Sequence, residues 1–286
     1  MKSEHLHIQR KPKWMKSPLP SGKTYIDVKE IVSKNKLHTI CVSGNCPNMG
    51  ECWNAGTATF MILGDICTRS CKFCATKSGK PTVTDWEEPK RVADSVVKMK
   101  LKHAVLTSVD RDDLEDGGSE IWAMTIKEIK KLSPSTTIEA LIPDFLGNTK
   151  HIQNVIDAGA DVISHNLETV RRLTPTTRSA AKYDRSLLVL EQIAKSGIRA
   201  KSGIMLGIGE SREEILETMD DLRRVGVEVM TIGQYLQPTK EHLPILVFIT
   251  PEVFEEYKNI GLSKGFRYVE SGPLVRSSYH AEKHVK

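Results

Sequence analysis

Long hydrophobic runs are missing from this sequence of 286 residues. No apolar stretch approaches the roughly 20 residues that a membrane-spanning helix needs, so we expect no membrane partner. The basic start of the chain, MKSEHLHIQRKPKWMKS, contains no apolar segment of the kind found in a secretory signal. Glu4, two histidines and the lack of an arginine-rich amphipathic pattern argue against an organelle transit peptide without excluding one. We therefore predict a cytoplasmic location, with an organelle matrix as the open alternative.

The sequence also lacks internal repeats, low-complexity segments and a strong excess of charge of one sign. Its formal net charge of +5 is modest and spread along the chain, so we expect no nucleic-acid partner. Solubility explains such a charge, and attraction to an acidic protein partner is the alternative. A chain of this length can bury a large core as one barrel-sized domain.

Cysteine is absent from most of the chain, because all 6 cysteines lie between Cys41 and Cys74. A disulfide framework is therefore a poor explanation, since such frameworks belong mainly to small secreted domains. The cysteines form two groups of three, with spacings C-x4-C-x5-C and C-x3-C-x2-C. The first group is Cys41, Cys46 and Cys52, and the second is Cys67, Cys71 and Cys74. Two groups of soft thiolates suggest two metal centres, each with one position left for another ligand.

From Thr57 onward, short apolar strands alternate with amphipathic helices. The predicted strands are 57–64, 103–109, 136–144, 161–168, 198–207 and 227–236, with one more possible at 266–271. The predicted helices are 27–35, 87–100, 119–131, 148–158, 185–195, 212–225 and 251–264. Such alternation predicts a parallel sheet with right-handed crossovers. Six βα units are too few for a closed eight-stranded barrel, so we predict an α/β fold with a partial, TIM-like barrel.

Terminal extensions are expected to cover the open part of this barrel. The predicted regions are an N-terminal extension at 1–56 with the first cysteine group, the barrel at 57–265, and a C-terminal extension at 266–286. Polar residues cluster after the strands, at 110–118, 143–145, 165–169, 207–210 and 234–238. In parallel βα folds the carboxyl ends of the strands carry the active site, and the second cysteine group follows the first predicted strand.

The segment CTRSCKFC carries the strongest chemical signal. Three thiolates on one tight loop can hold three irons of a four-iron four-sulfur (4Fe–4S) cluster and leave the fourth iron open. A zinc-stapled interaction module is one alternative, with His38, His103 or His165 as a fourth ligand, although zinc sites usually pair their cysteines. A simple electron carrier is another. Asp110, Asp112 and Asp113 could also form a carboxylate metal site, but helix capping or solvent exposure is the favoured explanation.

The spacing C-x3-C-x-aromatic-C, with Phe73 before the last cysteine, resembles the signature of the radical S-adenosylmethionine (SAM) superfamily. The preceding C-x4-C-x5-C resembles the lipoyl synthase family within it. Further similar stretches lie at 107–118, 138–145, 165–170, 201–210, 231–239 and 272–282, so the resemblance covers roughly 37–282. The segment ILVFIT at 245–250 is more apolar than the resemblance leads us to expect. A biotin-synthase-like, sulfur-inserting enzyme is the runner-up.

The resemblance implies a sulfurtransferase of lipoate biosynthesis that inserts two sulfur atoms at carbon atoms 6 and 8 of a protein-bound octanoyl-lysine. Its cofactors would be two 4Fe–4S clusters and SAM, with the second, auxiliary cluster as the sulfur donor. Its partners would be octanoylated lipoyl carrier domains, on 2-oxoacid dehydrogenase subunits or the glycine cleavage H protein, and a reducing partner such as ferredoxin or flavodoxin.

The resemblance also implies roles for individual residues. Cys67, Cys71 and Cys74 would hold the SAM-binding cluster, while Cys41, Cys46, Cys52 and Ser277 of the RSSY motif at 276–279 would hold the auxiliary cluster. The expected SAM-site residues are Phe73, Thr107, Asn166, Glu168 and Gln234. Asn166 and Glu168 are two positions apart on a predicted strand and should face the same side. Without the resemblance, a polar strand end explains them equally well, and the adjacent serines would be a solvated turn. Arg111 and Arg276 could orient the carrier or a cluster.

Overall fold

The computed structural model describes residues 11–17, 20–44, 46–54 and 59–285. The first ten residues, the boundary predicted between 56 and 57, and the first two residues of the strand predicted at 57–64 lie outside the described residues. Within the described residues, no helix is long and apolar enough to span a membrane.

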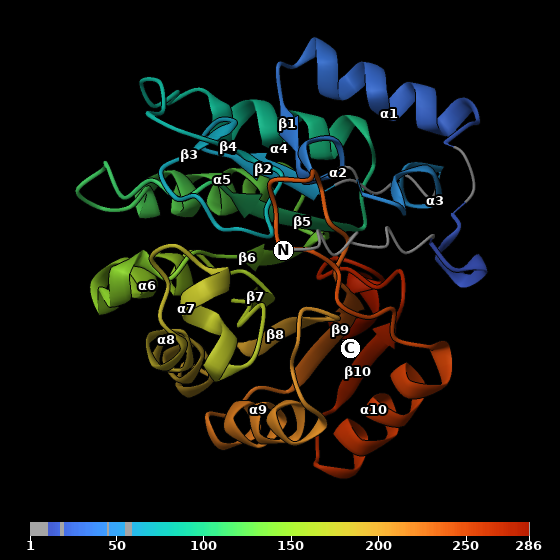
Figure 1. Ribbon diagram of the computed structural model, residues 1–286. Coiled ribbons are helices and arrows are strands. Elements are labelled where there is room, and N and C mark those ends of the chain that lie inside the picture. The colour runs from blue at the N-terminus through green and yellow to red at the C-terminus, as the bar shows by residue number, and fades with distance from the viewer. Residues whose placement is uncertain (1–10, 18–19, 45, 55–58, 286) are drawn as a thin grey trace.

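Eight strands form the main sheet, in the order β1-β2-β5-β6-β7-β8-β9-β10 (Figure 1). Their bounds are β1 His38–Thr39, β2 Thr59–Ile62, β5 His103–Ser108, β6 Thr137–Leu141, β7 Val162–Ser164, β8 Arg199–Leu206, β9 Val229–Gln234 and β10 Tyr268–Gly272. From β2 to β10 every neighbouring pair is parallel, and only β1 runs antiparallel, against β2. The sheet is open at β1 and β10 within the described residues, so the prediction of a partial barrel is confirmed.

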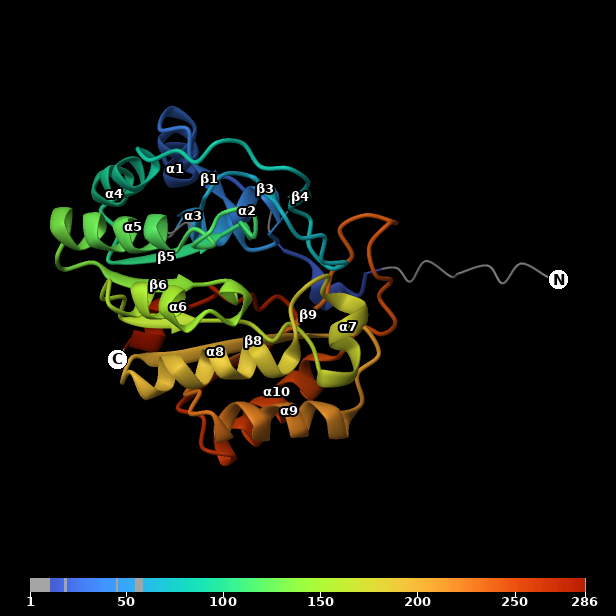
Figure 2. The same cartoon turned by 90° about the vertical axis from the view of Figure 1, so that its left-hand side faces the viewer.

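The longer helices lie on the outside of the curved sheet (Figure 2). The longer ones are α1 Lys23–Lys34, α4 Glu88–Lys98, α5 Ser119–Leu132, α6 Thr149–Ile156, α8 Tyr183–Lys195, α9 Arg212–Arg224 and α10 Pro251–Ser263. Local sequence sets their ends: Ser211 and Glu214 form a capping box at the start of α9, and Pro251 opens α10. All seven helices predicted from periodicity are therefore present, within a few residues of the expected bounds.

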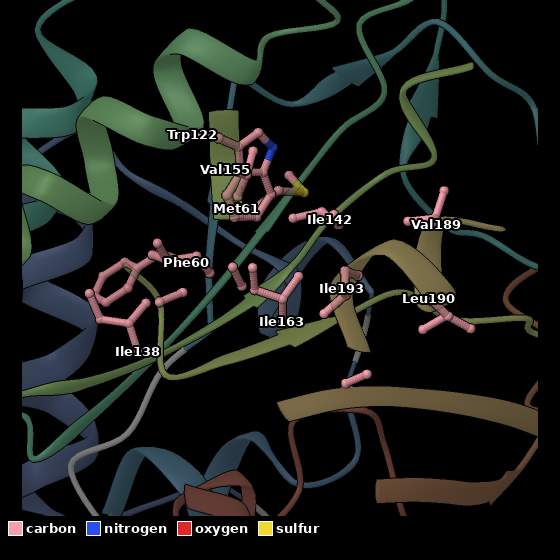
Figure 3. Packing of buried hydrophobic residues seen from close by; sticks show 14 of the residues in the cluster. Phe60, Met61, Trp122, Ile138, Ile142, Val155, Ile163, Val189, Leu190 and Ile193 are labelled. Atoms are coloured by element: carbon pink, nitrogen blue, oxygen red, sulfur yellow. The ribbon is translucent and has the colours of Figure 1, made fainter. Parts of the chain in front are cut away.

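The core lies between the sheet and this outer layer of helices. Figure 3 labels buried side chains from both layers, such as Phe60 of β2, Trp122 of α5 and Val155 of α6. Burying one such large apolar side chain contributes roughly 1.5–3 kcal/mol. The core therefore holds the strand ends in a rigid frame, and rigid strand ends are what a site built on the following loops requires.

Short elements that the sequence pattern did not predict lie in the terminal segments and in the loops around the barrel, several of them beside the cysteines. They are η1 Lys13–Met15, α2 Ile40–Ser43, α3 Met49–Asn54, β3 Ile66–Cys67, β4 Lys77–Ser78, η2 Phe145–Gly147, η3 Arg171–Leu173, α7 Thr174–Thr177 and η4 Ala281–Val285. None is long enough to show a hydrophobic period, so periodicity could not reveal them. The possible strand at 266–271 is confirmed as β10, which extends the parallel sheet beyond β9.

Candidate active site

A cavity of about 280 Å³ opens at the carboxyl ends of the parallel strands. Cys67, Cys71 and Cys74 line it on one side, and Ser277 of the C-terminal segment lines it as well. Four of the predicted SAM-site residues line the same cavity: Phe73, Thr107, Asn166 and Glu168. The structure thus brings together side chains from four separate parts of the chain, at the end of the sheet where a βα fold places its active site.

The loop Cys67–Cys74 is held to the barrel mainly through its backbone. The amide of Thr68 donates to Asp110 O over 3.0 Å, and the amide of Leu243 donates to Lys72 O over 3.0 Å. The Cys67 sulfur accepts two hydrogen bonds, from the amides of Arg69 at 3.4 Å and Asp110 at 3.3 Å. Amide donors aimed at sulfur favour the thiolate form, which is the form that binds iron.

Arg69, inside this loop, is the centre of a buried charge network. Its guanidinium contacts the carboxylates of Asp110 at 3.2 Å, Asp112 at 2.7 Å and Asp144 at 2.7 Å. Burial opposes ionisation of Asp144, yet the neighbouring Arg69 lowers the pKa of that carboxyl below its ordinary value. The network joins the cysteine loop to the ends of β5 and β6, so it fixes the loop at the cavity.

This network decides between the two expectations about the acidic run after β5. Asp110 and Asp112 contact Arg69, and Asp113 pairs with Arg111 at 2.8 Å. Asp112 and Asp113 are exposed, as the solvent alternative expected, and all three carboxylates pair with arginines. Within the described residues they form no shared cation position. Arg69 itself was missed because its partners are about 40 and 75 positions away, and no local pattern reports such a pairing.

A second cavity, of about 440 Å³, is lined by Cys41, Cys46 and Cys52. Two short helices present the first group of cysteines: Cys41 lies in α2 and Cys52 in α3. The amide of Cys46 donates to Cys41 O over 3.0 Å and closes the turn between the two helices. Thr39 caps α2 by accepting from the amide of Val42. Close sequence spacing and these local bonds place the three thiols around one cavity.

The C-terminal segment lies against both cavities. Asn48 donates its side-chain amide to Leu274 O over 2.7 Å, and the Tyr279 hydroxyl donates to Glu51 over 3.3 Å. A β-carbon on Gly233 would lie 2.2 Å from Val275 O, so only glycine permits this close approach to β9. Arg276 lines both cavities, and burial lowers the pKa of its guanidinium while Cys46 opposes that shift.

The two serines of the RSSY motif face different cavities. Ser277 lines the first cavity, with the second cysteine group, whereas Ser278 lines the cavity with Cys41, Cys46 and Cys52. The expectation that Ser277 faces the first cysteine group is therefore corrected. The segment runs through turns here, and adjacent residues of a turn direct their side chains to different sides. The motif alone could not distinguish the two positions.

Asn166 and Glu168 reach the first cavity for a different reason from the one expected. Strand β7 ends at Ser164, and Glu168 has a φ of 68°, in the left-handed region. The backbone of Glu168 is bonded to β8 on both sides, with its amide donating to Gly203 O and its carbonyl accepting from Met205. Both side chains therefore line the same cavity, as predicted. The cause is different, because pairing with β8 places them there and strand alternation does not.

The polar groups around these residues leave capacity for a ligand. The buried Asn166 Oδ1 has no hydrogen-bond partner within the protein. Burial raises the pKa of Glu168, and Arg178 and Asn166 oppose that shift. Arg178, which the sequence pattern did not single out, also donates to Asn166 O over 2.9 Å. An acceptor that is buried, unpartnered and directed at a cavity is what recognition of a polar small molecule requires.

Gln234 does not line the first cavity. Its amide nitrogen donates to Leu206 O at 3.0 Å and Val247 O at 3.1 Å, and its oxygen accepts from the amide of Ile249 at 2.8 Å. These bonds occupy the side chain and fasten the apolar segment at 245–250 against the ends of β8 and β9. Its predicted SAM contact therefore has no geometric support, and we assign Gln234 a structural role.

Burial favours the protonated form of four thiols, two in each site. It raises the pKa of Cys67 to about 12, with the carboxylate of Asp110 adding to the effect. It also raises the pKa values of Cys41, Cys46 and Cys74. Iron binding must displace these protons, so cluster assembly and deprotonation are coupled.

The donor sets fit 4Fe–4S clusters better than a single metal ion. Within the described ranges, no three His, Cys, Asp or Glu side chains converge as ligands of one ion. A cubane instead binds each cysteine at a different iron, so three thiols spread around a cavity suit it. His165, one of the residues considered for zinc, has both ring nitrogens bonded, to Ile142 O and the Ser186 hydroxyl. These observations weigh against the zinc-stapled module.

Comparisons with known proteins agree with this geometry. Residues 61–222 match the model of the radical SAM superfamily. A lipoyl synthase of Phocaeicola vulgatus is 62% identical over 277 residues, covering 97% of this chain and 98% of that protein. The mitochondrial lipoyl synthase of Nematostella vectensis is 59% identical over 276 residues, covering 96% of this chain and 95% of that protein.

Among solved structures, methylornithine synthase (PylB) has a similar fold. It gives a TM-score of 0.54 at 11% identity and covers 88% of this chain and 80% of that one. At so low an identity, the likeness concerns the fold alone. The sequence relatives are far closer, and with the two cysteine cavities they show that this chain belongs to the lipoyl synthase family of the radical SAM superfamily.

Proposed function

We propose that this chain inserts two sulfur atoms, at carbon atoms 6 and 8, into an octanoyl chain attached to a lysine of a lipoyl carrier domain. One observation carries the proposal: two cavities, each with its own group of three cysteines, adjoin at Arg276. A single cluster site would serve SAM cleavage or electron transfer alone. Two sites side by side suit a reaction in which a radical is formed at one and sulfur is taken from the other.

The first cavity would hold a 4Fe–4S cluster on Cys67, Cys71 and Cys74, with SAM beside it. Asn166 Oδ1, which has no partner within the protein, is the best placed acceptor for the amino group or ribose of SAM. Glu168 and Thr107 supply further polar groups, and Phe73 supplies an apolar wall. Arg178 holds the backbone of Asn166 in place.

The second cavity would hold the auxiliary cluster on Cys41, Cys46 and Cys52, with Ser278 as the fourth ligand. A serine oxygen is a harder and more readily lost ligand of iron than a thiolate. When bound, the first cluster and SAM would supply a radical that removes hydrogen from unactivated carbon, and the auxiliary cluster would supply sulfur. Neither task is open to side-chain acids and bases, because such C–H protons are far too weakly acidic.

The proposed partners are octanoylated lipoyl carrier domains and a one-electron reductant such as ferredoxin or flavodoxin. The mouth of the first cavity lies at the carboxyl ends of the strands, where the octanoyl chain of a carrier domain can enter. The cytoplasmic location expected from the sequence stays a prediction.

Anaerobic reconstitution tests the proposal. We expect about eight iron and eight sulfide per chain, as two four-iron clusters require. With an octanoyl-lysine peptide, SAM and a reductant, the product should be the lipoyl peptide. Zinc without sulfide would refute both cluster assignments. Fully clustered protein that cleaves SAM but leaves the octanoyl peptide unchanged would favour a different sulfur-inserting radical SAM enzyme.

A further inference from the structure

The last turn of the chain, η4, lies within the partial barrel, beside β5 and β6. Its His284 is completely buried. The turn comes directly after the segment that carries Arg276 and Ser278, and Ala281 and Glu282 line the second cavity. A buried histidine at the end of a chain requires specific partners, because an unpaired polar ring in the interior is costly.

Those partners form a buried polar cluster that no part of the proposed chemistry uses. Lys201 Nζ contacts Glu139 at 2.8 Å, and both side chains are fully buried. Ser164 donates to the other oxygen of Glu139 at 3.0 Å. Within the described residues, the other hydrogen-bond contact of the ammonium group is His284 Nδ1, at 3.3 Å. The end of the chain therefore completes the surroundings of an ion pair inside the barrel.

The chemistry of this contact determines the tautomer of His284. A lysine ammonium group can only donate, so Nδ1 must accept and the ring proton must lie on Nε2. Nε2 faces the carboxylate of Glu270 at 3.8 Å. Arg199 also donates to the backbone carbonyl of His284. His284 is thus held by Lys201 and Arg199 of β8 and lies near Glu270 of β10, while its Nε2 makes no hydrogen bond within the described residues.

We propose that His284 is a positioning residue for the second cysteine site. Its contact with the Lys201–Glu139 pair anchors the C-terminal segment, so that Ser278 and Arg276 stay at the cavity of Cys41, Cys46 and Cys52. The amides of Ala281 and Lys283 donate to Ser278 O and His280 O, and these bonds connect the anchored turn to Ser278. This inference rests on the proposed function, since it concerns the ligand set of the auxiliary cluster.

The test compares iron content, SAM cleavage and trypsin sensitivity among variants. His284→Ala should bind about four irons in place of about eight, keep SAM cleavage, and lose lipoyl peptide formation. His284→Asn should restore most of the iron, because its side-chain oxygen can accept from Lys201. His151→Ala, on the outer helix α6, is the matched control and should bind about eight irons. The trypsin comparison uses both proteins without metal. Trypsin should then cut after Arg276 or Lys283 at least several-fold faster in His284→Ala than in the unchanged protein.

Two results would overturn the inference. One is His284→Ala with about eight irons and an unchanged rate of trypsin cleavage. The other is His284→Asn that behaves like His284→Ala, which would make ring volume the relevant property. If His284→Ala does not fold, His284→Phe decides, because it keeps a ring of similar volume but offers Lys201 no acceptor, and the same loss of iron is expected. If the unchanged protein itself binds only four irons, the proposed function fails, whereas the trypsin comparison still tests the anchor.

Discussion

The two cysteine sites are built in different ways. The site of Cys67, Cys71 and Cys74 is one loop at a strand end, fastened by backbone bonds and by the buried Arg69 network. The site of Cys41, Cys46 and Cys52 is assembled from two short helices and a segment more than 200 positions later in the chain, as the bond between Asn48 and Leu274 shows. The cysteine loop of the first site should therefore depend less on the end of the chain than the second site does, although Arg276 and Ser277 also line the first cavity.

The largest effect is expected at the first site. Cys67→Ala removes one of the three thiols that hold the SAM-binding cluster, so both SAM cleavage and lipoyl peptide formation should fall below detection. The measurement is release of 5′-deoxyadenosine under reducing, anaerobic conditions. Wild-type release from this variant would remove Cys67 from the proposed ligand set.

Cys41→Ala sharpens the comparison because it should separate the two activities. The first cavity stays complete, so SAM cleavage should continue, while sulfur insertion should be lost and iron should fall to about four per chain. Parallel assays of 5′-deoxyadenosine and lipoyl peptide check this. Appearance of the lipoyl peptide would contradict the assignment of sulfur supply to the second site.

Arg69→Met tests what fastens the first site. It leaves the buried carboxylates of Asp144 and its neighbours without their main partner, and removing one partner of a buried pair typically costs about 3–5 kcal/mol. Urea unfolding of the metal-free protein should show a loss of this size. Arg212→Met, which breaks an exposed pair with Glu256, is the control and should change stability little. Equal stability of the two variants would show that the Arg69 network contributes nothing.

Ser277→Ala and Ser278→Ala test which serine belongs to the second site. Ser278→Ala should lower lipoyl peptide formation by about 10- to 100-fold, a range typical for the loss of a supporting group at a metal site, and should leave SAM cleavage intact. Ser277→Ala should keep the spectroscopic signature of the auxiliary cluster. The reverse pattern would restore Ser277 as the ligand.

Mild acid should weaken the frame of the first site. His165 lines the first cavity, and burial lowers its pKa to about 4, below the roughly 6.5 of an unfolded histidine. Since the unfolded chain binds this proton more readily, the free energy of unfolding should fall as the pH drops below about 6.5. Between pH 7 and 5 the loss from His165 is about 2 kcal/mol. Urea unfolding of metal-free protein at both pH values measures it, and His165→Gln should flatten the dependence; an equal slope in this variant would assign the effect to other groups.

Sequence periodicity located the βα units because each strand and helix carries its own hydrophobic pattern. The strand predicted at 161–168 was too long, because β7 already ends at Ser164 and Glu168 has a left-handed backbone conformation. That change depends on bonds to β8, which no local pattern records. The sequence pattern did not predict the helices α2 and α3, because they are too short to show a hydrophobic period.

By itself, the sequence determined the alternating architecture, the two groups of cysteines and the family. These properties depend on the spacing of residues and on local hydrophobicity, and both can be read directly from the sequence. Only the tertiary structure decided which serine lies with which cysteines, that Gln234 fastens the segment at 245–250, that Arg69 joins the cysteine loop to Asp144, and that His284 contacts Lys201. Each of these depends on contacts between residues that folding alone brings together.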